Sequence, residues 1–125
     1  PACIAVKSAE LQSAEYGARY LSLARKAVMV ESKNIARLQT LFDLAADLSR
    51  QENGFDCELF GNDLQDRGID AFRRDWQEAK YRGITRFPTL VFKTPGRPAA
   101  VLSGYQTYET LKSLLNSQKD HNTDP

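Results

Sequence analysis

The sequence lacks the features that mark several classes of protein. No apolar run approaches the roughly 18 residues of a membrane-spanning helix, and the first residues lack the basic-then-apolar order of a secretion signal. The 17 basic residues are balanced by 16 acidic ones, so the net charge of +1 gives no reason to expect a nucleic acid or an anionic membrane as partner. A chain of 125 residues with 42% apolar content is instead typical of an ordinary globular domain.

Chemically reactive side chains are also scarce. The two cysteines, Cys3 and Cys57, form no C-x-x-C, and the lone His121 has no cysteine or serine partner close in sequence. Because there are two cysteines, one disulfide between them is possible, but the pattern favours two small buried hydrophobic side chains. With no glycine-rich phosphate loop and no metal-ligand spacing, we expect no catalytic residue, no metal and no cofactor in this chain.

The first half of the chain is predicted to be helical. A short helix over about 3–11 precedes a longer one that reaches roughly Asn34, and apolar residues recur in the longer one at spacings of three and four: Tyr16, Tyr20, Leu23, Ala27 and Val30. Asn34 is a good N-cap for the next helix, whose apolar face is Ile35, Leu38, Leu41, Phe42, Ala45 and Leu48. We expect Gly54 to end that helix in the left-handed conformation.

Two more helices are predicted before the pattern changes. Asp56 caps a short helix that runs to about Gln65 and that Gly68 breaks. A second helix follows with the repeat Ile69, Phe72, Trp76 and Ala79, and Gly83 closes it. The aromatic side chains at helical spacing are interpreted as core.

At Thr85 the period changes to that of strands. Residues 89–92 and 99–102 read as two strands joined by a Pro- and Gly-containing turn, hence an antiparallel hairpin. A last helix follows, with Tyr108, Leu111, Leu114 and Leu115 as its buried face, and the residues after Ser117 read as a polar tail. The predicted fold is therefore α+β and mainly helical, with four to five helices, a β-hairpin and a C-terminal helix.

The phrase Gly83-Ile-Thr-Arg-Phe-Pro-Thr, followed by strand, turn, strand, Ser-Gly-Tyr and a closing helix, resembles the C-terminal half of a thioredoxin fold. More narrowly, it resembles the DsbA family, in which a helical subdomain is inserted between a β-α-β unit and such a β-β-α unit. The opening Pro1-Ala-Cys-Ile-Ala-Val is similar to the start of that insert in a bacterial protein-disulfide isomerase branch. The resemblance covers residues 1–117 and implies a helical insert over 1–83 and a β-β-α half over 84–117. Residues 118–125 are expected to form a disordered tail.

The resemblance also implies a substrate site. In the family, the bond corresponding to Phe87-Pro88 is cis, and the exposed backbone before the proline accepts an extended peptide or thiol substrate by strand-like hydrogen bonds. Arg86, Phe87, Pro88 and Thr89 would then form one wall of the active site. From the residues alone, Pro88 reads equally as a trans proline that opens an edge strand, and Arg86 as a solvated surface charge.

The nucleophilic cysteines of the family have no counterpart in this sequence. They form a C-x-x-C at the start of the first thioredoxin helix, or a Ser or single Cys there in glutathione-using isomerases, whereas Cys3 matches a cysteine of the helical insert. We therefore expect the C-terminal portion of a thiol-disulfide oxidoreductase, inactive by itself. The alternatives are a non-catalytic thioredoxin-like protein-binding module and a remnant of a glutathione-dependent enzyme related to the hydroxychromene-carboxylate isomerases.

The expected partner is a thiol- or disulfide-containing protein or peptide. The outer edge of residues 89–92 has no predicted neighbour strand, so we also expect a homodimer through this hairpin edge. Sparse cysteine usage favours the cytoplasm, although the chain begins with Pro1 and any upstream targeting information is not visible.

Overall fold

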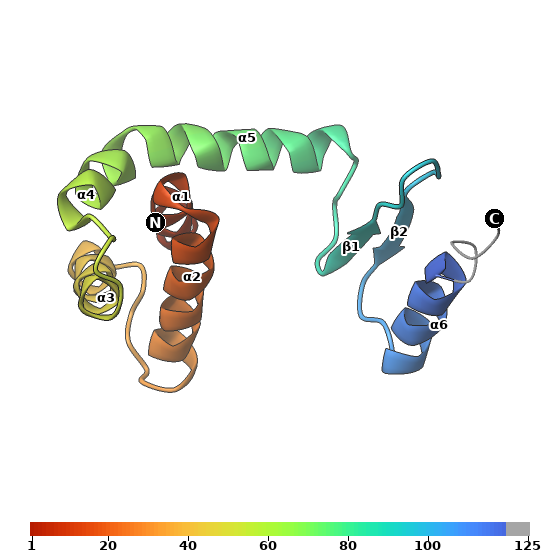
Figure 1. Cartoon of the computed structure of the whole chain (residues 1–125), viewed down its shortest axis with the longest axis horizontal. Coiled ribbons are helices and arrows are strands. Elements are labelled where there is room, and N and C mark those ends of the chain that lie inside the picture. Colours follow the sequence, from red (N-terminus) through yellow and green to blue (C-terminus); the bar gives the residue numbers. More distant parts are fainter. Residues whose placement is uncertain (120–125) are drawn as a thin grey trace. The chain divides into compact units, whose positions relative to one another are not determined.

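The computed structural model describes residues 1–119, which form six helices and one two-stranded antiparallel sheet (Figure 1). The elements are α1 (Ala2–Gln12), α2 (Ala14–Met29), α3 (Leu38–Gln51), α4 (Cys57–Gln65), α5 (Arg67–Tyr81), β1 (Thr89–Phe92), β2 (Ala100–Ser103) and α6 (Tyr108–Lys119). The predicted mainly helical α+β fold, with five helices before the hairpin and one after it, is confirmed. None of the described helices is long and apolar enough to cross a membrane.

The chain divides into two compact units, residues 1–78 and the residues from 79 onward. The domain boundary expected between residues 83 and 84 stays a prediction. Most of the predicted tail, including His121, lies outside the described residues, while α6 continues to Lys119.

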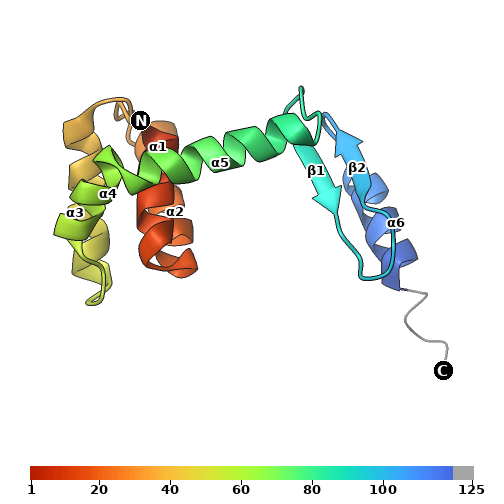
Figure 2. The same ribbon diagram turned by 90° about the horizontal axis from the view of Figure 1, so that it is seen from above.

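The core of the first unit is built from alanines on α1 and α2, from Tyr20 on α2, and mostly from larger side chains on α3, on α4 and between them. The buried apolar residues are Ala5, Ala9, Tyr20, Ala24, Ala27, Leu41, Leu44, Ala45, Leu48, Phe55, Phe60 and Leu64. Helices α1 and α2 lie side by side (Figures 1 and 2), and at Gly17 a Cβ atom would stand 2.7 Å from the Cβ of Glu10. Glycine at this position therefore permits the close helix pair.

An aromatic cluster joins α2, α3 and α4. The ring of Phe60 lies 5.3 Å from that of Tyr20, 5.8 Å from Phe55 and 6.1 Å from Phe42, measured between centroids. The hydroxyl of Tyr20 is fully buried and donates a hydrogen bond of 2.9 Å to the Leu41 carbonyl. Burial raises the pKa of the Tyr20 phenol, so the neutral form that makes this bond is favoured.

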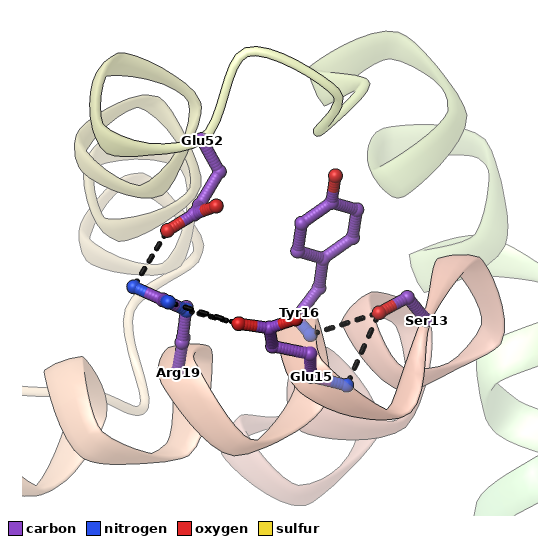
Figure 3. A network of polar contacts seen from close by, with 5 residues as sticks. All are labelled: Ser13, Glu15, Tyr16, Arg19 and Glu52. Carbon is purple, nitrogen blue, oxygen red and sulfur yellow. Dashed lines mark hydrogen bonds and ion pairs between the residues drawn. The ribbon is translucent and has the colours of Figure 1, made fainter.

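Side-chain caps fix the starts of two helices. The Asp56 carboxylate accepts from the N–H groups of Glu58 and Leu59, so the predicted cap of α4 is confirmed. The Ser13 hydroxyl does the same for α2, a cap that the sequence reasoning missed. Figure 3 shows this cap beside Arg19, whose guanidinium contacts Glu15 at 2.9 Å and Glu52, the residue that follows α3, at 2.6 Å.

Two glycines have roles other than those predicted. Gly54 does not have a positive φ, and a Cβ there would stand 2.5 Å from the Tyr16 hydroxyl, at the far end of that side chain. Gly68 does not break a helix but lies in the first turn of α5, where a Cβ would stand 2.2 Å from the Ser8 hydroxyl and 2.7 Å from the Asp63 carbonyl. Both predictions failed because they assigned these glycines a role in the backbone conformation, whereas a side chain there would meet a tertiary contact.

The entry to α3 also differs from the prediction. Asn34 caps a turn, accepting from the N–H of Ala36, and the helix begins only at Leu38 with no side-chain cap at Arg37. Val30 lies beyond the end of α2 and is exposed, so it does not extend the buried stripe of that helix. The apolar period continued past the point where the backbone leaves the helix.

The second unit has almost no interior. Strands β1 and β2 pair with Leu90 opposite Leu102 and Val91 opposite Val101. Leu102 shares a groove with Leu114 and other residues of α6, which places α6 on that face of the sheet. From residue 79 to residue 117 no side chain is buried, and Tyr108 and Leu115, predicted to be core, are exposed, as is Trp76 on α5.

Candidate substrate-binding edge

The candidate site begins where α5 ends. Gly83 adopts a positive φ of 65°, its N–H donates to the Lys80 carbonyl, and the N–H of Ile84 donates to the Ala79 carbonyl. This is the hydrogen-bond pattern with which a left-handed glycine closes a helix. The predicted stop at Gly83 is confirmed, and the chain leaves the helix in an extended course toward β1.

Residues 86–89 form a turn that is fixed at the start of β1. The Phe87-Pro88 peptide bond is cis. The Thr89 hydroxyl donates a bond of 2.6 Å to the Arg86 carbonyl, and the Pro88 carbonyl accepts one of 2.7 Å from the N–H of Gly104. Gly104 has a φ of 82°, a conformation that favours glycine. The turn that contains the four predicted site residues is therefore held by one bond from the Thr89 side chain and one backbone bond from Gly104.

Side-chain exposure in this turn is high. Phe87 is 81% exposed, and Arg86 and Pro88 are exposed as well, while Thr89 is half-buried. An exposed phenylalanine loses the hydrophobic free energy that burial would give, roughly 1.5–3 kcal/mol. An exposed apolar side chain of this kind indicates an interaction surface when backbone groups with free hydrogen-bonding capacity lie beside it.

The backbone of β1 provides those groups along its outer edge. Because Pro88 bonds to Gly104, the alternation of an antiparallel ladder makes Leu90 and Phe92 the residues that bond to β2. The N–H and C=O groups of Thr89 and Val91 then point away from β2. In the described part of the chain, β1 has no other neighbouring strand, so these groups form an edge that can accept an extended chain.

Both cysteines belong to the first unit and are distant from β1 in the sequence. Both thiols are free; Cys3 is exposed, so its predicted burial is wrong, and Cys57 is half-buried with its Sγ 3.5 Å from the Ala45 carbonyl. Cys3 borders an apolar cavity of about 180 Å³ with Val6, Val28 and Ile35, which no sequence pattern indicated. Among residues 1–119, no group of three or more His, Cys, Asp or Glu side chains could hold a metal ion.

The comparisons with known proteins agree with this fold. A family model described as Thioredoxin matches residues 1–113, and the chain belongs to that family. Within it, the chain is related to the DsbA-like disulfide isomerases, because its structure matches the crystal structure of a "putative protein disulfide isomerase" from Nitrosomonas europaea. That match has a TM-score of 0.78 and 28% sequence identity, and it covers 97% of this chain and 57% of that one.

A second relative is an adapter protein and not an isomerase by name. The ClpXP adapter protein SpxH of Halalkalibacterium halodurans is 32% identical over 90 residues, which cover 71% of this chain and 28% of the relative. The chain thus spans little more than half of the solved structure and less than a third of the adapter. Together with the family match, these relatives support a thiol-disulfide oxidoreductase family.

Proposed function

We propose that residues 86–89 bind the extended chain of a thiol- or disulfide-containing protein, as part of a DsbA-like disulfide isomerase whose redox cysteines lie outside these 125 residues. The observation that carries the proposal is the exposure of Arg86, Phe87 and Pro88 in a turn that is held by the Thr89–Arg86 and Gly104–Pro88 hydrogen bonds. Family membership and the related isomerase structure support the same chemistry.

The proposed role of the site is positioning. A substrate strand bonds to the exposed backbone before Pro88, and Phe87 covers its apolar side chains. In thiol-disulfide exchange a thiolate attacks a disulfide sulfur, one S–S bond forms, another breaks, and the displaced sulfur leaves as a thiolate. The exposed Arg86 is placed to attract such a thiolate or an acidic substrate.

Peptide binding tests the site directly. A short unfolded peptide with one cysteine should shift the amide resonances of Arg86 and Phe87 more than those of Val101 and Leu102 on β2. Phe87→Ala should weaken binding by about tenfold, the equivalent of roughly half the transfer free energy of a buried phenylalanine. Tyr108→Ala, which also removes an exposed ring from this unit, is the control. Equal shifts along the whole hairpin, or equal weakening by both variants, would refute the site.

An activity measurement tests where the redox chemistry resides. The 125-residue protein should not accelerate insulin reduction by dithiothreitol, because its sequence has no C-x-x-C. Robust turnover that disappears in Cys3→Ser or Cys57→Ser would overturn this part of the proposal and make that cysteine the nucleophile.

A second candidate function is that of a non-catalytic protein-binding module. The similarity to an adapter protein favours it, since an adapter needs a docking surface and no nucleophile. The genomic sequence before the codon for Pro1 separates the candidates. A C-x-x-C about thirty codons upstream supports the oxidoreductase, a Ser or single Cys the glutathione-dependent branch, and a start codon at this point the binding module. The cytoplasmic location is likewise a proposal, which cell fractionation would test.

A further inference from the structure

Positive and negative charges are distributed unevenly along the chain, although they nearly cancel in total. Residues 1–78 contain 10 basic and 13 acidic side chains, whereas residues 79–108 contain five basic side chains and no acidic one. The five are Lys80, Arg82, Arg86, Lys93 and Arg97, and all are exposed. The segment that carries the candidate site is therefore positive, and the unit before it is negative.

The two groups of basic side chains also differ in their partners. Seven of the ten in residues 1–78 form ion pairs with carboxylates, namely Lys7, Arg19, Lys26, Lys33, Arg50, Arg67 and Arg73. In the described part of the chain, Arg86, Lys93 and Arg97 have no ion pair, and residues 79–108 contain no side-chain carboxylate that could provide one. Their charges therefore act on molecules that approach the hairpin.

Arg86 is the one of these three that lies in the candidate site itself. The Thr89 hydroxyl donates a bond of 2.6 Å to the Arg86 carbonyl, so the backbone of Arg86 is fixed in the turn that also exposes Phe87. A guanidinium group carries five N–H donors in a rigid fork that matches a carboxylate. Arg86 can therefore bind an acidic side chain of a segment whose apolar side chains contact Phe87.

We propose that the site at residues 86–89 selects protein segments that carry acidic side chains beside the cysteine, with Arg86 as the residue that pairs with them. The proposal rests on the proposed function, since it names the class of protein segment that this site takes. Lys93 and Arg97 contribute by attracting the negative segment to the hairpin. The same three charges repel a basic segment, so the site discriminates by the sign of the charge.

Salt concentration separates the contact of Arg86 from the attraction by the other two charges. Lys93 follows the end of β1, about 14 Å along the strand from Thr89, and Arg97 lies in the turn between β1 and β2. Charges in solution act over about 30 Å at about 0.01 M salt, but only over about 10 Å at about 0.1 M. We therefore expect Lys93 and Arg97 to influence binding at low salt only, and Arg86 at both salt concentrations.

Three short peptides test the preference. They share their apolar residues and carry glutamate, glutamine or lysine on both sides of a central serine, which replaces cysteine so that no disulfide forms with the exposed Cys3. Fluorescence anisotropy with an uncharged dye gives the dissociation constants. At about 0.01 M salt, the glutamate peptide should bind at least about tenfold more tightly than the lysine peptide. Equal binding of these two peptides would overturn the proposal.

Variants that remove one charge locate the preference. At about 0.1 M salt, Arg86→Gln should reduce the ratio of the two dissociation constants about threefold to fivefold. Arg25→Gln is the matched control, since it removes the same charge from an exposed position of α2 in the first unit, and it should leave the ratio unchanged. Lys93→Gln combined with Arg97→Gln should reduce the ratio at about 0.01 M salt and not at about 0.1 M. Equal effects of Arg86→Gln and Arg25→Gln would overturn the role of Arg86.

Two further measurements separate this proposal from others. If a single-stranded DNA oligonucleotide of the same charge displaces the glutamate peptide as effectively as the unlabelled peptide does, the site takes any polyanion and the proposal is wrong. The glutamine peptide tests the proposed function separately, through the amide resonances of Arg86 and Phe87. Shifts there without a difference between the two charged peptides overturn the preference for acidic segments alone. No shift with any of the three peptides refutes the proposed function as well.

Discussion

The contact between Gly54 and Tyr16 allows a stability prediction with an internal control. Gly54→Ala places a methyl group 2.5 Å from the Tyr16 hydroxyl, whereas ordinary contact begins near 3.4 Å. The ring must therefore move, but it packs edge-on against Phe55 with 5.5 Å between centroids. Figure 3 shows the Tyr16 ring extending from α2 with its hydroxyl away from the helix, so the clash falls on the end of the side chain.

The size of the effect follows from two opposing contributions. Overpacking of this kind costs about 1–3 kcal/mol. Because φ at Gly54 is not positive, alanine is conformationally allowed there, and reducing the freedom of the unfolded chain returns about 0.4–1 kcal/mol. We expect Gly54→Ala to lower the free energy of unfolding by roughly 1–2 kcal/mol.

Removing the hydroxyl should remove the penalty. In Tyr16→Phe the nearest ring atom, Cζ, lies 3.7 Å from the alanine methyl position, which is an ordinary contact. The double variant Tyr16→Phe with Gly54→Ala should therefore be at least as stable as Tyr16→Phe, with a coupling of about 1–3 kcal/mol between the two sites. Urea denaturation followed by circular dichroism measures all four proteins. If the double variant is as unstable as Gly54→Ala, the hydroxyl is not what excludes a side chain, and the reasoning fails.

Three further outcomes are expected. The pKa of Tyr20 is raised by burial, so stability is fully present below pH 10 and decreases above it as the unfolded phenol ionises; Tyr20→Phe should abolish this decrease in alkaline thermal melts. Asp56→Ala should cost about 1 kcal/mol in urea denaturation by removing the cap of α4, whereas Arg37→Ala, at a helix start without a side-chain cap, should cost less than about 0.5 kcal/mol. The exposed Cys3 should react with Ellman's reagent well before the half-buried Cys57, and simultaneous reaction would contradict their difference in exposure.

Local signals predicted much of the fold. The cap at Asp56, the stop at Gly83 and the change of period after Thr85 each act over a few residues, and the structure places helix ends and strands within a few residues of these marks. The candidate site at residues 86–89 was predicted from the resemblance of the segment around Phe87 to the C-terminal half of a thioredoxin fold. What the structure adds is the outward direction of Thr89 and Val91, which depends on the bond between Gly104 and Pro88.

Burial was less predictable than secondary structure. Tyr108 and Leu115 lie on an apolar stripe but are exposed, while Tyr20 and Leu41 lie on similar stripes and are fully buried. A stripe shows which face of a helix could be buried, because the helical period depends on the residues themselves. Whether that face is covered depends on a neighbour that the pattern does not contain.

The sequence by itself determined the element types, the sharp helix ends and the family, because capping, glycine stops and periodicity are properties of neighbouring residues. Only the tertiary structure decided what a side chain at residues 54 and 68 would meet, which apolar stripes are buried and which backbone groups of β1 point away from β2. These depend on contacts between segments far apart in the chain, such as Tyr16 with Gly54 or Ser8 with Gly68, and local pattern contains no information about them.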